Sequence, residues 1–180
     1  PSTTRKARAR GFAYLKTSER AHESEPRGGM TACGLANLEM ARFVLTQGGR
    51  KRAAWDKRKD AAAVQEAIYD GIAWLDRNWS PFEDPHARQS NIYHVYWLYA
   101  LERAMDLLGL QLVGGHRWYS EMGQELLNRQ RDGHWNTKGN AGGHDILDTC
   151  FALLFLKRAT MDQIPNTSVT GGSERPADNR

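Results

Sequence analysis

The sequence has little of what marks a secreted or membrane-spanning protein. Its 180 residues contain two cysteines, Cys33 and Cys150, which we expect to be reduced, buried thiols, with a single disulfide as the alternative. No apolar run approaches the roughly 18–20 residues that cross a bilayer, and no apolar segment of a signal peptide follows the basic N-terminus. The sequence therefore predicts no transmembrane segment.

Familiar catalytic signatures are also missing. There is no Gly-x-Ser-x-Gly elbow, no phosphate-binding loop and no dinucleotide fingerprint. The net charge of +4, from 25 basic and 21 acidic residues, does not require a polyanionic partner. Basic residues gather at Arg5–Arg10 and Arg50–Lys59, but no nucleic-acid motif accompanies them. We expect no nucleic-acid partner.

Helical periodicity is what the sequence has most of. Apolar residues recur at three- and four-residue steps over Met30–Thr46, which predicts a helix with one buried stripe. That stripe consists of Leu35, Leu38, Ala41 and Leu45. The further predicted helices are Asp60–Asn78, Ser90 or Asn91 to Leu108, His116–Arg131 and Asp145–Thr160. Residues 16–29 are expected to form a loop, and residues 50–59 a basic loop or helix start.

Two classes of helix alternate along the chain, which indicates an internal repeat. The apolar class shares the pattern L-x-x-L-[EK]-x-A, beginning at Leu35, Leu98 and Leu153. In this register Thr31, His94 and Thr149 are equivalent, as are Met30, Tyr93 and Asp148. The amphipathic class shares G-x-x-[WL]-L-x-R-[NQ], beginning at Gly71 and Gly123. The alternation predicts a layer of buried inner helices and a layer of half-buried outer helices, with an ordinary helical bundle as the alternative.

The segment that ends the fourth predicted helix carries a resemblance to a known family. Leu126-Leu127-x-x-Gln130-x-x-Gly133-x-Trp135 resembles the QW motif of the terpenoid cyclases, including squalene–hopene cyclase, whose α/α toroid is shared with protein prenyltransferase β subunits. Asp148-Thr149-Cys150 and Met30-Thr31-Ala32 are similar to the inner-helix starts of that family. Gly11-Phe12-Ala13-Tyr14 resembles the end of an earlier QW-type turn.

The resemblance implies an all-α fold, a partial α/α toroid of alternating inner and outer helices that forms about half of an (α/α)6 barrel. The toroid segment would span residues 11–160, between a disordered basic N-terminus at 1–10 and a disordered tail at 161–180. The ring would be closed by the remainder of a longer parent chain or by a protein partner.

Physical chemistry explains why the repeat would use Gln130, Gly133 and Trp135. A glutamine at a helix end can bond the unpaired backbone groups of its own and the neighbouring helix. A tryptophan offers a large flat surface for stacking, and a glycine permits a left-handed turn. These three residues are therefore predicted to be structural.

An acidic motif, Asp-x-Asp-Asp-Thr-Ala, starts the reaction in the cyclases of this family. The corresponding stretch here is Asp145-Ile146-Leu147-Asp148-Thr149-Cys150. Leu147 replaces the central acid and cannot donate a proton, so proton-initiated cyclisation is not expected. The alternative role for Asp145 and Asp148 is to stabilise the positive N-terminal end of their helix.

A zinc site would follow the protein prenyltransferases, which hold zinc with an Asp-x-Cys pair and a histidine. Asp148 and Cys150 match the pair, and His94 is the candidate third ligand. The order of these ligands along the chain is reversed relative to the family. We therefore expect a buried, hydrogen-bonded His94, an inert Cys150 and no cofactor.

Ligand binding is predicted at the aromatic third helix, where Tyr93, Tyr96 and Trp97 can hold an isoprenoid; simple core packing is the alternative. A glycosidase carboxylate pair drawn from Glu83, Asp84, Asp145 or Asp148 also remains open. The function we expect is that of a catalytically incomplete repeat module that binds a protein partner or an apolar ligand on its inner-helix face. The alternative is part of a terpenoid cyclase or prenyltransferase acting on an isoprenoid.

Overall fold

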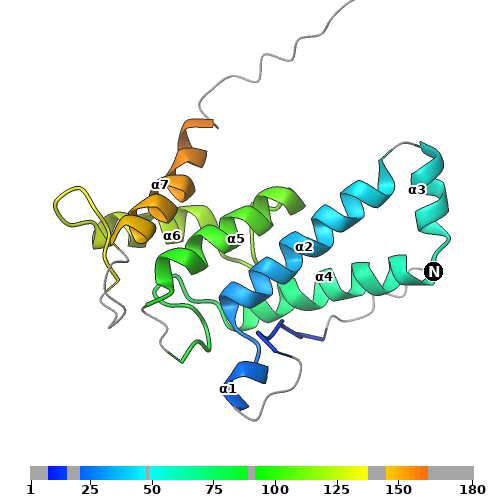
Figure 1. Ribbon diagram of the computed structural model, residues 1–180, viewed down its shortest axis with the longest axis horizontal. Helices are drawn as coiled ribbons and strands as arrows, with labels where there is room; N and C mark the ends of the chain where they lie inside the picture. Colours follow the sequence, from blue (N-terminus) through cyan, green and yellow to red (C-terminus); the bar gives the residue numbers. More distant parts are fainter. Residues whose placement is uncertain (1–7, 16–20, 48, 89–91, 138–144, 162–180) are drawn as a thin grey trace, which may run out of the picture.

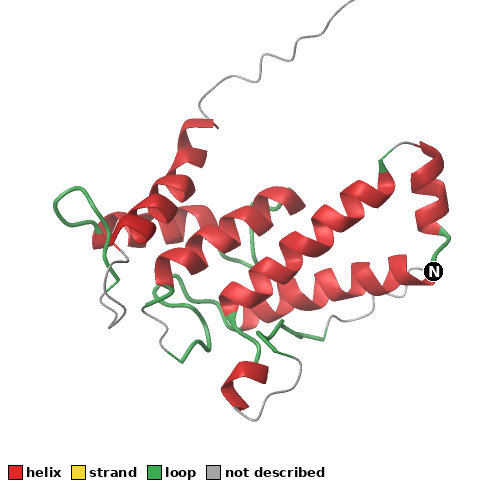
Figure 2. Ribbon diagram, in the orientation of Figure 1, coloured by secondary structure: helices red, strands yellow, loops and turns green. Residues whose placement is uncertain are grey.

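The structure, a computed structural model, describes residues 8–15, 21–47, 49–88, 92–137 and 145–161. The elements in these ranges are the helices α1 (Ala21–Ser24), α2 (Gly28–Thr46), α3 (Gly49–Asp56), α4 (Lys59–Arg77), α5 (His94–Leu108), α6 (Trp118–Arg129) and α7 (Asp145–Met161). Figure 2 shows helices and loops without a strand in this part of the chain, so the all-α prediction is confirmed there. None of the described helices is long and apolar enough to cross a bilayer.

The five helices expected from periodicity are α2, α4, α5, α6 and α7, with ends displaced by a few residues. The segment 16–29, expected as loop, contains the short helix α1, and of the two alternatives for residues 50–59 the structure has a helix, α3. Trp55 explains α3, because its side chain is buried and Arg58 lies 5.9 Å from its ring centroid. One apolar anchor therefore holds a segment whose composition is otherwise that of a solvated loop.

The helices pack in two layers (Figure 1). In one layer α2 lies against α5, and α5 lies against α7, with the N-terminal ends of all three on the same side. In the other layer α4 packs on α2, whereas α6 contacts both α5 and α7. The helices α4 and α6 run in the direction opposite to the first three. The apolar and amphipathic classes of the repeat therefore occupy different layers.

The core is centred on α5. Trp97, Leu98 and Leu101 are fully buried, and so is Glu102. The Glu102 carboxylate accepts two hydrogen bonds of 2.6 Å from the guanidinium of Arg103, which supplies the partner that a buried charge needs. Glu102, the charged residue that follows the apolar part of α5, is thus part of the core.

The predicted buried stripe of α2 is correct only in its first half. Leu35 is fully buried and Leu38 is half-buried, but Ala41 and Leu45 are exposed. The last turns of α2 extend past the end of α5 towards α3, so these residues face no inner helix (Figure 1). Periodicity predicts which side of a helix is apolar, whereas the length of the neighbouring helix decides how much of that side is covered.

Three equivalent side chains hold the starts of α2, α5 and α7 to the preceding loops. Phe12 N donates to Thr31 Oγ1 (3.0 Å), His94 Nε2 to Pro81 O (2.8 Å), and Trp135 N to Thr149 Oγ1 (3.1 Å). Residues at equivalent positions of the repeat therefore each bond a backbone group of the preceding loop. Phe12 takes the place that Trp135 has in the last repeat.

The turn after α6 brings Trp135 back to the end of that helix, within hydrogen-bonding distance of Leu126 O. Asp132 and Gly133 have φ angles of 49° and 80°, and Arg131 and His134 exchange two backbone hydrogen bonds of 3.0 Å. Gly133 suits this left-handed turn because it has no Cβ.

The side chain of the predicted Gln130 is exposed, and this residue bonds the end of α6 only through its backbone N, which donates to Leu127 O at 3.3 Å. Other side chains bond the remaining carbonyls described there. Trp135 is buried, and its indole Nε1 donates to Leu126 O at 2.7 Å. Arg131 Nη1 donates to Asn128 O at 2.8 Å. The capping role therefore lies with the tryptophan and the arginine, because the chain turns away at Gln130 into an extended conformation.

The N-terminal segment differs from a disordered end over residues 8–10. Arg8 N and Arg10 Nε each lie 2.6 Å from the carboxylate of Asp70, which is buried in α4. A buried aspartate needs such donors. The rest of the predicted terminus, residues 1–7, and residues 162–180 of the predicted tail lie outside the described residues.

Replacing Trp135 tests this construction. Trp135→Ala should lower the free energy of unfolding by about 3 kcal/mol, because a buried aromatic ring is lost. Trp135→Phe should cost about 1 kcal/mol, because it keeps most of the packing and loses the bond to Leu126 O. Thermal melting measures both, with Leu127→Ala, at a half-exposed neighbouring position, as the control. Unchanged melting of Trp135→Ala would contradict the role assigned to this side chain.

Candidate functional site

A hollow of about 510 Å³ lies at the N-terminal ends of α2 and α5. It is lined by Tyr14, Glu23, Arg27, Met30, Asp84, Arg88, Tyr93 and Tyr96. The lining joins aromatic rings, two arginines and two carboxylates, contributed by α1, α2, α5 and the loops beside them. A concave site that combines aromatic surface with charged groups is a candidate small-molecule site.

Asp84 is the buried polar residue of this hollow. The loop between α4 and α5 carries it to the start of α2, where Gly29 N donates to Asp84 Oδ1 at 2.8 Å and Gly28 N donates to Pro85 O at 3.0 Å. A Cβ on Gly28 would lie 2.7 Å from Asp84 Oδ1, so only glycine permits this approach. Asp84 thus caps α2 from a distant part of the chain.

Burial raises the pKa of Asp84 from 3.8 to about 6, against the opposing effects of the Gly29 backbone bond and the nearby Arg27. The carboxyl therefore loses its proton only just below neutral pH. A carboxyl of this kind, lying on a hollow, can bind a ligand hydroxyl or exchange a proton with it.

Tyr93 and Tyr96, which the sequence predicts as ligand-binding, both line the hollow. Tyr93 is about half exposed. The Tyr96 hydroxyl lies 3.1 Å from Cys33 Sγ, and Phe151 of α7 packs edge-on against its ring at 5.6 Å. Burial, followed by the Cys33 thiol, raises the pKa of Tyr96, so this phenol stays protonated and can donate a hydrogen bond.

Trp97 does not share that role. Its side chain is fully buried, and Nε1 donates to Ser80 O at 3.1 Å. On a helix, residues one apart point in different directions, so Trp97 enters the core while Tyr96 faces the hollow. The prediction that all three aromatic residues bind a ligand is therefore corrected for Trp97.

The candidate acids Asp145 and Asp148 lie in different surroundings. Asp148 is buried, and its Oδ2 is 2.8 Å from Thr137 N and 2.6 Å from Thr137 Oγ1. Asp145 is exposed, and Leu147 between them is half exposed. Asp148 therefore ties the start of α7 to the loop after α6, as a helix-end carboxylate does.

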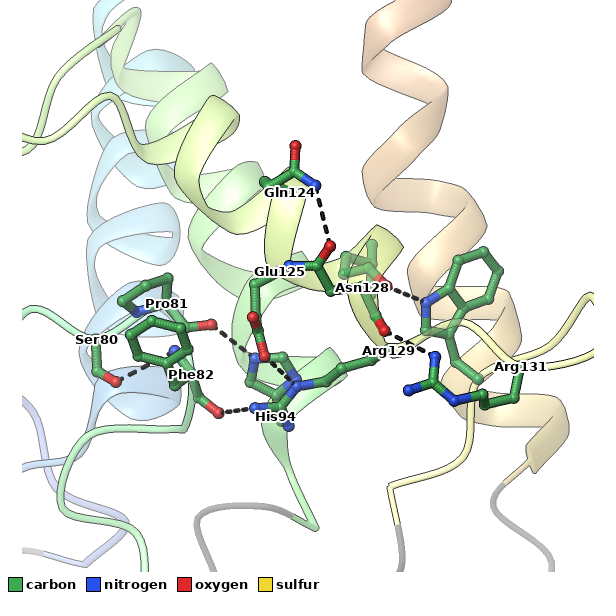
Figure 3. A network of polar contacts seen from close by, with 11 residues as sticks. Ser80, Pro81, Phe82, His94, Gln124, Glu125, Asn128, Arg129 and Arg131 are labelled. Carbon is green, nitrogen blue, oxygen red and sulfur yellow. Dashed lines mark hydrogen bonds and ion pairs between the residues drawn. The ribbon is translucent and has the colours of Figure 1, made fainter.

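The candidate zinc ligands differ in their surroundings. His94 is fully buried and bonded to Pro81 O (Figure 3), and burial lowers its pKa from 6.5 to about 4. Cys150 is exposed rather than buried, and Cys33 is half-buried; both thiols are free. Among the residues that the structure describes, no group of three or more His, Cys, Asp or Glu side chains gathers to hold a metal ion.

From the sequence, Asp84 was predicted only as one of the possible glycosidase carboxylates, and its capping of α2 was not predicted. The signal was present in Arg27-Gly28-Gly29, because a helix that starts there lacks a Ser, Thr, Asp or Asn cap of its own. The neighbouring Glu83 is exposed. The two arginines of the hollow, Arg27 and Arg88, had no sequence signal, since they come together only through the loops.

No family model, no curated protein and no solved structure matches this chain. The resemblance to the terpenoid cyclases therefore stays a prediction that rests on the sequence motifs.

The burial of the Asp84 carboxyl predicts a specific pH dependence of the free energy of unfolding. The folded protein binds this proton more tightly than the unfolded chain, so the stability that it contributes is present below about pH 4 and is lost as the pH rises through about 6. Asp84→Asn keeps an acceptor for Gly29 N and removes the titration. Relative to the unsubstituted protein, its free energy of unfolding should rise by on the order of 2 kcal/mol between pH 4 and 7. Urea denaturation measures the difference in free energy of unfolding between the two proteins. A difference that does not change with pH would contradict the burial of the Asp84 carboxyl.

The burial of His94 predicts the opposite dependence of stability on pH. Its pKa is lowered on folding, so the stability that it contributes is present above about pH 6.5 and is lost as the pH falls to about 4. His94→Gln keeps a donor for Pro81 O and does not titrate. Its free energy of unfolding, relative to the unsubstituted protein, should rise by on the order of 2 kcal/mol as the pH falls over this range. The same denaturation series tests it, and a flat difference would mean that His94 is solvated.

Proposed function

We propose that this chain is a catalytically incomplete repeat module of an α/α toroid that binds an apolar ligand on its inner-helix face. The observation that carries the proposal is the shared hollow. Met30 of α2 and Tyr96 of α5 line it together, with Tyr93 at the start of α5. Residues from two inner helices at one concave site are what an inner-face binding module requires.

The lining also indicates the class of ligand. Aromatic rings and a methionine suit an apolar body, whereas Arg27 and Arg88 suit an anionic end group. An isoprenoid with a diphosphate group combines both features. Leu147 stands where the family's acid would be, which supports binding without proton-initiated cyclisation.

One observation favours the alternative, an enzyme that acts on an isoprenoid. Asp84 is a carboxyl with a pKa of about 6 at the edge of the hollow, which is near the value that suits a general acid. In this alternative Asp84 would donate the proton that Leu147 cannot. Its hydrogen bond to Gly29 N equally serves the helix cap, so binding is the function we propose first.

Titration calorimetry with farnesyl diphosphate and with farnesol tests the proposal. Both ligands should bind, the diphosphate with a dissociation constant on the order of 10 μM. Tyr96→Ala should weaken both by about tenfold, and Arg88→Ala should weaken the diphosphate alone, because farnesol has no charge. Leu112→Ala, at an exposed apolar position outside the lining, is the control.

Absence of binding by both ligands at millimolar concentration would overturn the proposal. Mass spectrometry of the same mixtures separates the two functions. A new product that disappears in Asp84→Asn would favour the enzyme, whereas unchanged ligand favours the binding module.

A further inference from the structure

A second concave surface, of about 770 Å³, lies between α6 and the loop that follows α4. Residues 79–82 of that loop form one wall, and the other wall is the side of α6 that carries residues 120–128. We refer to this surface as the α6 groove. Its volume falls within the range of about 300–1,000 Å³ that small-molecule sites occupy, and its lining shares no residue with the hollow.

Two side-chain bridges hold the walls of the α6 groove together. Trp79 Nε1 donates to Glu121 Oε2 at 2.9 Å, and Arg129 Nη2 donates to Phe82 O at 2.7 Å (Figure 3). Each bridge joins the loop to α6. The groove is therefore preformed, so a ligand does not have to order its walls on binding.

The loop wall is apolar. The Phe82 side chain is 59% exposed, and Pro81 lies beside it in the chain (Figure 3). Trp79 is fixed by its bridge and by His116, whose ring stacks on it at 4.8 Å with an angle of 16° between the planes. The face of an aromatic ring carries partial negative charge, and the polarised C–H groups on the face of a pyranose ring pack well against such a surface.

The α6 wall is polar. Ser120, Gln124 and Asn128 recur at steps of four residues, so they share one side of the helix, and all three are exposed. Gln124 Nε2 donates to Asn128 Oδ1 at 3.0 Å, which orients Gln124 Oε1 as an acceptor and Asn128 Nδ2 as a donor. Sugar hydroxyls both donate and accept hydrogen bonds. This row is about 12 Å long at the rise of an α-helix, a length that suits a disaccharide.

The charged groups of the α6 groove have partners within the protein. Glu121 Oε2 accepts from Trp79 and lies 3.1 Å from His116 Nδ1, and Glu125 forms an ion pair with Arg129. A ligand is therefore not needed to balance a carboxylate. An apolar wall opposite a wall of hydroxyl and amide groups suits a ligand that is neutral, has an apolar face and carries hydroxyls at its rim.

We propose that the α6 groove binds a neutral pyranose sugar, with the ring on Phe82 and the hydroxyls bonded to Ser120, Gln124 and Asn128. The inference is independent of the proposed function, because the α6 groove and the hollow are separate sites.

NMR spectroscopy of the full 180-residue chain, labelled with ¹⁵N, tests the inference with cellobiose, maltose and lactose. At least one of these disaccharides should shift the indole N–H signal of Trp79, with a dissociation constant on the order of 1 mM. The signal is assigned by its absence from Trp79→Phe. The indole of Trp118, which is fully buried and bonded to Leu110 O, is the internal reference and should not shift.

Substitutions in each wall locate the sugar. Phe82→Ala should weaken binding by about tenfold, because the ring surface is lost while the backbone O that bonds Arg129 remains. Tyr69→Ala, at an aromatic position of similar exposure outside the lining, is the matched control. Asn128→Ala should weaken binding by about fivefold, the effect of one hydrogen bond, whereas Gln130→Ala, at an exposed amide outside the lining, should not change it.

The inference is overturned if none of the three disaccharides shifts the Trp79 signal at about 50 mM. Undiminished binding by Phe82→Ala or by Asn128→Ala would also overturn it, since the sugar would then not use both walls. Choline that binds at least about tenfold more tightly than the sugars would identify a cation site instead. Tyr96→Ala should leave disaccharide binding unchanged, and Phe82→Ala should leave farnesyl diphosphate binding unchanged, so the two proposals can fail separately.

Discussion

The structure depends on how each inner helix is joined to the loop before it. Thr31, His94 and Thr149 occupy the same register position, and each bonds a backbone group of the preceding loop. Unpaired backbone groups are costly at buried helix ends, so one polar side chain at a fixed position sets where the loop can run. The three inner helices therefore start on the same side of the molecule, and the outer helices return in the opposite direction (Figure 1).

The hollow follows from the same constraint. The loop that meets His94 at Pro81 continues to Asp84, which caps α2 through Gly29 N. That path leaves Tyr93 and Tyr96 beside the carboxyl at the edge of the two-layer structure. Buried His94 stays neutral near pH 7, and Asp84 gains its proton close to neutral pH. The polar groups that organise the fold are thus also the ones that give the site its chemistry.

The repeat explains which side chains are covered and which are not. Leu35 is buried against Gly71 of α4 and Leu98 is buried in α5, whereas Leu153 has the same residue type at the same register and is exposed. The apolar character of a face is encoded locally. Its burial depends on a neighbour that sequence periodicity alone does not supply.

The sequence by itself determined five of the described helices and the alternation of two helix classes, because these depend on residues close together in the chain. It misjudged the side-chain role of Gln130, which came from a motif, and the surroundings of Trp97 and Cys150, which came from residue type, since neither tells which side the residue faces. Only the tertiary structure decided that Trp135 bonds Leu126 O and that Asp84 caps a helix 55 residues away. The physical reason is that a carboxylate or an indole satisfies whichever backbone group the fold brings within hydrogen-bonding distance, and that pairing is set by the path of the loops.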